Sequence, residues 1–200
     1  MKYSDNEIFL IVLNTVKGLE YKNKFFIYEK IKDISSLKEK IDFTKSVLSE
    51  IKEVDESFTN NLFSKEYIDY VLKDIVNNGE TVVTIDSNGY PECLREIVNP
   101  PLVLYCKGDI SLLKSNNFSI VGSRKCLPLS VSISERFTEI LGDNGFTLVT
   151  GIAEGIDVSV LRTALKNNQK VISVVVGGLS SVYPKAHQNV FEEVIKKGLV

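Results

Sequence analysis

The chain has 200 residues, of which 44% are apolar, and a formal net charge of −2 at pH 7. This is enough to bury one good core and a smaller second one. Three cysteines without a close pair and a single histidine exclude a disulfide framework, a zinc knot and a multi-histidine metal site, so no metal or cofactor is expected.

The apolar run 8–13 is the first feature along the chain. It is six residues long, follows Asp5 and Glu7, and lacks the basic start of a signal peptide. A run of this length is far too short to span a bilayer. Unpaired cysteines are typical of a reducing compartment. Together these features predict a soluble cytoplasmic protein with no membrane partner.

Residues 5–78 have the pattern of a small helical domain. Apolar residues recur at helical spacing among many Lys, Glu and Asn, with Gly18 as the one glycine and with no proline. The pattern predicts four or five amphipathic helices that end at Asn77-Asn78-Gly79, a typical helix C-terminus. We assign residues 1–78 to a helical N-terminal domain and expect no catalysis there.

Residues 79–200 change to an alternation of strands and helices. The runs 81–85 and 102–106 predict two strands of a connector, with a short helix and the break Asn99-Pro100-Pro101 between them. From residue 116 the expected order is strand 118–121, helix 129–141, strand 146–149, helix 157–166, strand 171–176 and helix 187–197. This alternation implies right-handed crossovers and a Rossmann-like parallel sheet, so we assign 79–200 to an α/β domain. The ending Gly198-Leu199-Val200 looks like the start of another strand, so the sheet is expected to be incomplete at its C-terminal end.

Three glycine turns follow the predicted strands of this half. Gly122 follows the first strand, Gly151 and Gly155 follow the second, and Gly177-Gly178 follows the third. At the carboxyl edge of a parallel sheet, free backbone N–H groups and the positive ends of helices attract phosphate. The charge distribution agrees, because residues 114–200 hold ten Lys and Arg against seven Asp and Glu, whereas residues 1–113 have a net charge of −5. We therefore expect an anion-binding groove where the three turns converge.

Three side chains near these turns each have a second interpretation. Arg124 has the planar fork that suits phosphate oxygens, or it is an exposed surface charge. Asp157 stands at a helix start, where it could serve as an N-cap alone. His187, with Lys185 at the entry of the last helix, could be a surface residue. The sequence has neither a G-x-x-x-x-G-K-[ST] loop nor a G-x-G-x-x-G fingerprint, and no acid pair at a spacing that indicates hydrolysis.

Six motifs of this half, in their order and spacing, resemble the DprA/Smf family of DNA-processing proteins. They run from about Thr81 to Val200 and comprise Tyr90-Pro91-Glu92-Cys93-Leu94-Arg95-Glu96-Ile97, Asn99-Pro100-Pro101-Leu102-Val103-Leu104-Tyr105, Lys107-Gly108-Asp109, Ile120-Val121-Gly122-Ser123-Arg124, Thr150-Gly151-Ile152-Ala153-Glu154-Gly155-Ile156-Asp157, and Gly178-Leu179 with Tyr183-Pro184. The resemblance implies a Rossmann-like domain that binds single-stranded DNA and loads the RecA recombinase onto it, during DNA uptake and natural transformation. It also implies a binding protein and not an enzyme, with a short helical domain before the sheet.

By position, the resemblance implies a set of DNA- or phosphate-binding residues. The turn Gly122-Ser123-Arg124 would hold a phosphate, and Gly151, Gly155 and Asp157 would shape the second wall. Lys170, just before the third strand, stands where the family often places a DNA-contacting Lys. The full expected set is Gly122, Ser123, Arg124, Lys125, Gly151, Glu154, Gly155, Asp157, Lys170, Gly177, Gly178, Lys185 and His187. Backbone N–H groups together with Arg and Lys bind nucleic acid independently of its sequence and with strong salt dependence.

The chain departs from the family at two motif positions and at its end. Val160-Leu161 stands where the family commonly has Ala-His, and His187 stands where it often has Asn. The family's domain continues beyond residue 200 with further strands, an Arg-Asn-Arg segment and a dimerising surface. The chain therefore resembles a truncated form, in which a homodimer is not favoured and the sheet would expose an apolar edge strand.

Two other functions stay open from the sequence. Related Rossmann-like folds bind nucleotides or cleave nucleoside monophosphates, and in such an enzyme Glu154 or Asp157 would be the acid. Alternatively, the domain would sense a small nucleotide and pass the signal to a partner through the N-terminal helices.

Overall fold

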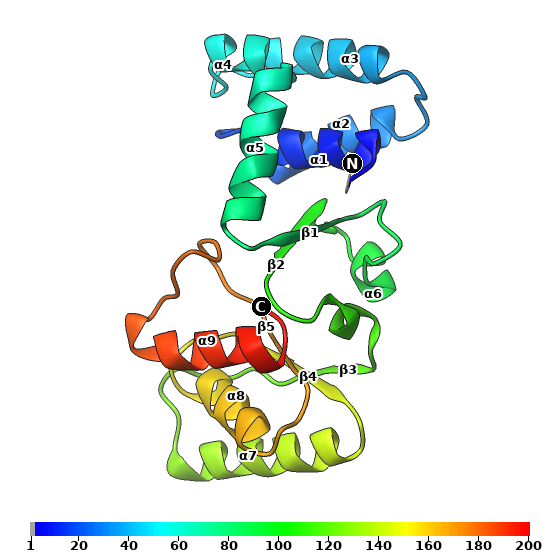
Figure 1. Ribbon diagram of the computed structural model, residues 1–200. Coiled ribbons are helices and arrows are strands. Elements are labelled where there is room, and N and C mark those ends of the chain that lie inside the picture. The colour runs from blue at the N-terminus through cyan, green and yellow to red at the C-terminus, as the bar shows by residue number, and fades with distance from the viewer. Residues whose placement is uncertain (1–2) are drawn as a thin grey trace. The chain divides into compact units, whose positions relative to one another are not determined.

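The computed structural model describes residues 3–200, except for the side chains of 56–58, and divides into two compact units, Met1–Leu104 and Tyr105–Val200 (Figure 1). The expected domain boundary at residue 78 thus falls inside the first unit. The reason is β1 (Thr81–Thr84), which contacts α1 (Asp5–Asn14) and α5 (Lys65–Asn77) and places Val82 and Val83 in a buried position.

Five helices occupy residues 5–77 of the described chain, as the apolar spacing predicts. Besides α1 and α5 they are α2 (Tyr21–Ile31), α3 (Leu37–Ser49) and α4 (Glu56–Asn61). Ser4, Ser36 and Ser64 cap α1, α3 and α5, each accepting a hydrogen bond from the backbone N–H three residues later. The apolar run 8–13 is buried on every side of α1 and forms the centre of this unit's core. Among the described residues, no helix has the length and apolar character that a bilayer crossing requires.

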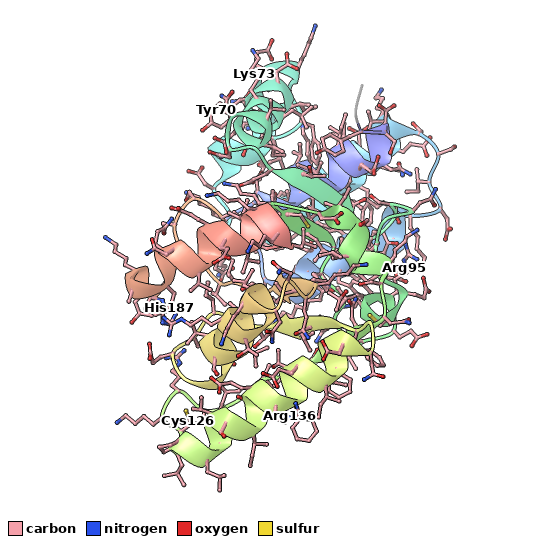
Figure 2. All side chains as sticks on the ribbon, turned by 60° about the horizontal axis from the view of Figure 1, so that its bottom comes forward. Tyr70, Lys73, Arg95, Cys126, Arg136 and His187 are labelled. Atoms are coloured by element: carbon pink, nitrogen blue, oxygen red, sulfur yellow. The ribbon has the colours of Figure 1, made fainter. Side chains whose placement is uncertain are left out.

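A short connector follows these helices. β1 pairs with β2 (Val103–Cys106) in a two-stranded sheet, and α6 (Glu92–Arg95) lies between them in the chain. Arg95 (Figure 2) ties the connector together, because its guanidinium donates hydrogen bonds to the carbonyl oxygens of Ile85 (2.9 Å) and Ser87 (3.1 Å) and lies over the ring of Tyr90. Burial raises the pKa of Tyr90 to about 12. Arg95 therefore has a structural role in the 90–97 motif.

The second unit contains a parallel sheet in the order β3 (Asn117–Ser119), β4 (Thr147–Thr150), β5 (Val171–Ser173). Next to β5 lies Leu199, which bridges Ile172 in parallel, and Val200 exchanges two 2.9 Å backbone hydrogen bonds with Lys107. The strand start expected at the end of the sequence is therefore represented only by isolated bridges of Leu199, between β5 and residues 107–108, and not by a further strand.

Three helices cover one face of this sheet: α7 (Pro128–Asp143), α8 (Ile156–Lys166) and α9 (Gln188–Lys197). Successive strands step across the sheet in one direction, so right-handed crossovers put all three helices on the same side. Figure 1 shows α8 between α7 and α9, and α8 contacts both. Leu148, Val171, Leu161 and Val194 meet in the core between sheet and helices. These features confirm the predicted α/β class.

The third predicted strand is shorter than expected. β5 ends at Ser173. Beyond it, pairing with β4 continues for one more hydrogen bond, from Val174 N–H to the Thr150 carbonyl oxygen (2.8 Å). Val174 and Val176 then leave the sheet and are exposed. The chain continues through Gly177-Gly178 and the cis Tyr183-Pro184 bond to the short 3₁₀ helix η2 (Lys185–His187). This departure opens the carboxyl edge of the sheet.

Candidate nucleic-acid interface

The first two glycine turns interlock at the carboxyl ends of β3 and β4. A Cβ on Gly122 would lie 2.6 Å from Ile156 Cγ1, and one on Gly155 would overlap the carbonyl oxygen of Ser123. Gly155 has φ +87°, and the next residue, Ile156, donates its N–H to that same oxygen (3.3 Å). Only glycine permits this backbone contact, since a Cβ would separate the turns. The glycines thus bring Arg124 beside the start of α8.

Asp157 locks the two turns together. Its Oδ1 accepts a hydrogen bond from Gly122 N–H (3.3 Å), and its carboxylate lies directly against Gly151. The residue at the N-cap of α8 is Gly155, and no side chain caps the helix. The N-cap interpretation of Asp157 is therefore wrong, because its carboxylate reaches across to another strand end. Gly122 N–H is engaged by Asp157 and is not free for a phosphate.

A cleft of about 650 Å³ opens at this edge of the sheet. Its polar lining comes from Arg124, Glu154 and Asp157, and its apolar lining from Val174, Val175, Val176, Ile152 and Pro184, with Tyr183 at the same opening. Tyr183 is 79% exposed. A cleft of this volume accommodates a nucleotide-sized ligand. Arg124, Gly151, Glu154 and Asp157 are thus brought together as expected, whereas the third turn contributes 174–176 and 183–184 in place of Gly177 and Gly178.

A second cavity, of about 400 Å³, adjoins the first, and Arg124 and Glu154 line both. Lys125, Gly155 and Arg162 line this second cavity, together with Cys126, Glu135 and Ser159. The Glu135 carboxylate accepts a hydrogen bond from the Ser159 hydroxyl (3.0 Å). Arg162 is not among the site residues expected from the sequence. Its spacing from Gly155 and Ser159, which places all three on one helix face, is the signal that could have indicated it.

His187 is buried, with 2% of its surface exposed, so the interpretation as a surface residue is wrong. It lies at the start of α9 (Figure 2), where Nδ1 is 2.8 Å from the Ile152 carbonyl oxygen and Nε2 is 3.0 Å from Glu154 Oε2. The Ile152 carbonyl can only accept, so Nδ1 carries the proton of that bond. The ring does not reach a ligand in solvent. It positions the loop that forms the wall between the two cavities.

The remaining expected residues lie around or away from the cleft. Ser123 and Lys125 are exposed on the first turn, and the Ser123 hydroxyl donates to the Lys125 carbonyl (2.8 Å). Lys185 is exposed next to Pro184. Lys170 precedes β5, at the amino edge of the sheet and opposite the cleft. There it assists the Ser111 hydrogen bonds in lowering the pKa of Asp109. The structure therefore does not bring Lys170 to the cleft.

His187→Ala is expected to destabilise the Tyr105–Val200 unit by about 2 to 3 kcal/mol, through the cavity left behind and the lost hydrogen bond to Ile152. Glu154 contributes little to this loss, because its side chain is 68% exposed and solvent screens the pair. Urea unfolding followed by far-UV circular dichroism measures the change. His187→Gln, which keeps one donor and more volume, should recover part of it. Equal stability of the alanine variant and the parent chain would contradict the positioning role.

Comparison with known proteins identifies relatives of this chain. The family of DNA recombination-mediator protein A matches residues 81–200, which is more than half of the chain. The chain belongs to this family. The DprA/Smf resemblance is thereby confirmed, and the match begins at β1, so the two-stranded connector and the parallel sheet both fall within it.

Curated DprA proteins and a solved structure agree with this assignment. The chain is 31% identical to the DNA processing protein DprA of Bacillus subtilis over 127 residues, 63% of this chain and 43% of that protein. It is 38% identical to DprA of Streptococcus pneumoniae over 99 residues, 50% of this chain and 35% of that protein. The X-ray structure of Streptococcus pneumoniae DprA superposes with a TM-score of 0.72 and 25% identity, covering 100% of this chain and 67% of the other. The chain thus spans less than half the length of these curated relatives.

Proposed function

We propose that the cleft binds single-stranded DNA and that the chain acts as a cytoplasmic DNA-processing protein in DNA uptake and natural transformation. One observation carries this proposal. Arg124, the exposed ring of Tyr183 and the apolar side chains of 174–176 line one cleft at the carboxyl edge of the sheet. A cation for the phosphate beside an aromatic ring for the base is the combination that single-stranded nucleic acid requires.

The preference for a single strand follows from two kinds of side chain that line the cleft, a cationic one and an aromatic one. Arg124 has no ion-pair partner among the described residues, so its guanidinium is available to a phosphate oxygen. Tyr183 offers a ring face that stacks on an unpaired base, whereas a duplex hides its base faces. The second cavity adds Lys125 and Arg162 next to Arg124, so three cations outnumber Glu135 and Glu154 there and suit a neighbouring phosphate.

Delivery of the bound strand to the RecA recombinase is the finer part of the proposal. Its support is membership of the DNA recombination-mediator family.

We also propose that the chain is a binding protein and not an enzyme. The two acids of the cleft are already engaged, Asp157 with Gly122 N–H and Glu154 with His187 Nε2.

Fluorescence anisotropy with labelled oligo-dT and with a duplex of equal length tests the binding proposal over a range of salt. Tight binding of the single strand, weaker binding of the duplex and a linear loss of log affinity with log salt are expected. Equal affinity for both, or no binding of either, would contradict the binding proposal.

Incubation with nucleoside monophosphates addresses the enzyme alternative. Release of free base or sugar phosphate, abolished by Glu154→Gln, would support the enzyme. Calorimetry with mononucleotides against oligo-dT separates the nucleotide sensor from both.

A further inference from the structure

The cleft contains an acid that phosphate binding does not explain. Glu154 lines the cleft together with Arg124, although a carboxylate repels a phosphate and lowers the affinity of a cationic cleft for nucleic acid. Its side chain is 68% exposed, so it lies at the opening of the cleft and not in the core of the unit. A ligand that carries hydrogen-bond donors as well as phosphates would give this carboxylate a task in binding.

A buried residue holds the Glu154 carboxylate in place. Its Oε2 lies 3.0 Å from Nε2 of His187, at the start of α9 (Figure 2), and the Nδ1 of the same ring lies 2.8 Å from the Ile152 carbonyl oxygen. Glu154 Oε1 has no hydrogen-bond partner among the described residues. A carboxylate has about four lone-pair sites, so both oxygens can still accept a donor from the cleft. Because the side chain is positioned in advance, binding costs less conformational entropy.

The other charged side chains of the cleft have different tasks. Arg124 has donors only, which suit a phosphate oxygen. The Asp157 carboxylate accepts a hydrogen bond from Gly122 N–H and lies against Gly151, so the glycine turns already engage it. Glu154 is therefore the carboxylate that is available to a base stacked on Tyr183, which lines the same cleft.

We propose that Glu154 contacts the base that stacks on Tyr183 and favours guanine, an inference that rests on the proposed binding of single-stranded DNA. Guanine alone among the four bases has two adjacent donors, N1–H and N2–H, on its Watson–Crick edge, and they match the two oxygens of a carboxylate. Thymine has a single N3–H between two carbonyl oxygens, which a carboxylate repels. Adenine and cytosine each place an acceptor nitrogen beside their amino group. A single strand exposes this edge of the base.

Base recognition by Glu154 adds to phosphate binding by Arg124 and does not replace it. The ring of Tyr183 and the apolar side chains of 174–176 accept the face of any base, and a phosphate contact is independent of sequence. The cleft therefore binds every single strand, and a guanine at this one position increases the affinity. Since Glu154 is exposed to solvent, the gain should be about five- to tenfold and not larger.

Anisotropy titrations with four strands of equal length test this preference. The strands are oligo-dT and repeats of dT-dT-dG, dT-dT-dA and dT-dT-dI, in which the base of dI is guanine without its N2 amino group. The dG repeat is expected to bind about five- to tenfold more tightly than oligo-dT. The dI repeat should lose most of this gain. The dA repeat, whose purine stacks as well as guanine, should show little of it.

The possible results separate this inference from the proposed function. Equal affinity for all four strands would overturn the guanine preference and leave the proposed DNA binding intact. Equally tight binding of the dG, dI and dA repeats would assign the gain to purine stacking and would also overturn it. A chain that binds none of the strands would overturn both proposals.

Glu154→Gln tests whether this side chain is the source of the preference. The amide has the size of the carboxylate but replaces one acceptor oxygen with an NH₂ donor, so the gain of the dG repeat over oligo-dT should disappear. The affinity for oligo-dT itself should rise slightly, because a negative charge near the phosphates is removed. Glu193→Gln is the matched control, since Glu193 pairs with Lys197 (2.8 Å) and lines neither cavity. It should leave the ratio of the two affinities unchanged. A guanine preference that persists in Glu154→Gln would overturn the assignment to Glu154.

Discussion

Gly155→Ala is expected to destabilise the Tyr105–Val200 unit by about 3 kcal/mol, because strain in the backbone and overlap of atoms add together. Gly155 has φ +87° and ψ −126°, a region that side-chain-bearing residues essentially never adopt. A Cβ there would overlap the Ser123 carbonyl oxygen and lie 2.8 Å from that of Arg124. Both obstacles are backbone atoms, so no side-chain rotation relieves the overlap. The midpoint of urea unfolding, followed by far-UV circular dichroism, measures the loss.

Gly145→Ala is the matched control for this change. Gly145 lies in the same unit with φ +84°, but nothing stands within 4 Å of a Cβ placed on it. Its substitution should cost only the strain of the positive φ, about 1 kcal/mol. The difference between the two variants isolates the contact between the two glycine turns. Equal losses in both variants would mean that this contact contributes nothing to stability.

Arg124→Ala is expected to weaken the binding of single-stranded DNA by about ten- to a hundredfold, which is the loss of one hydrogen-bonded charge contact of about 1.5 to 3 kcal/mol. The loss should be the same for all sequences, because a phosphate contact reads no base. The slope of log affinity against log salt should flatten by about 0.7, the value for one phosphate of a single strand. Anisotropy titrations with oligo-dT and oligo-dA at several salt concentrations measure both quantities.

Lys170→Ala serves as the comparison for Arg124→Ala. Both substitutions remove one positive charge from the same unit, but Lys170 lies at the amino edge of the sheet, opposite the cleft. Its substitution should change affinity less than twofold. Should Lys170→Ala weaken binding as much as Arg124→Ala, the strand would have to run over the amino edge, and the cleft would not be the DNA site.

Several features of this fold follow from local patterns. The Ile8–Leu13 run and the spacing of later apolar residues predict the N-terminal helices. The alternation after residue 116 predicts β3, α7, β4, α8 and α9 nearly at their observed bounds, whereas β5 ends at Ser173, before its expected end at Val176. The glycine turns could also be placed after the predicted strands, because each glycine follows an apolar run in the sequence. Helical and strand periodicities depend on neighbours within a few residues, so the sequence is sufficient to indicate them.

Side-chain placement at the site was less predictable. Asp157 reaches Gly122, 35 residues away, and His187 reaches Ile152 at the same separation. Tyr183 and Arg162 line the cavities although no local pattern singles them out as ligands. Such contacts depend on which strand ends are adjacent and on how the chain leaves β5, and neither is determined by short-range periodicity.

The sequence by itself determined the class of fold, the position of the glycine turns and the family, since each depends on residue type at short spacing or on motif order. Only the tertiary structure decided that His187 is internal, that Lys170 faces the opposite edge, and that α7 turns Ser134 and Thr138 inward while Leu129, Ile133, Phe137 and Ile140 are exposed. An apolar stripe specifies a helix but not the surface against which it packs. The packing between whole elements determines which face is buried. Here the small side chains of α7 permit its close approach to α8.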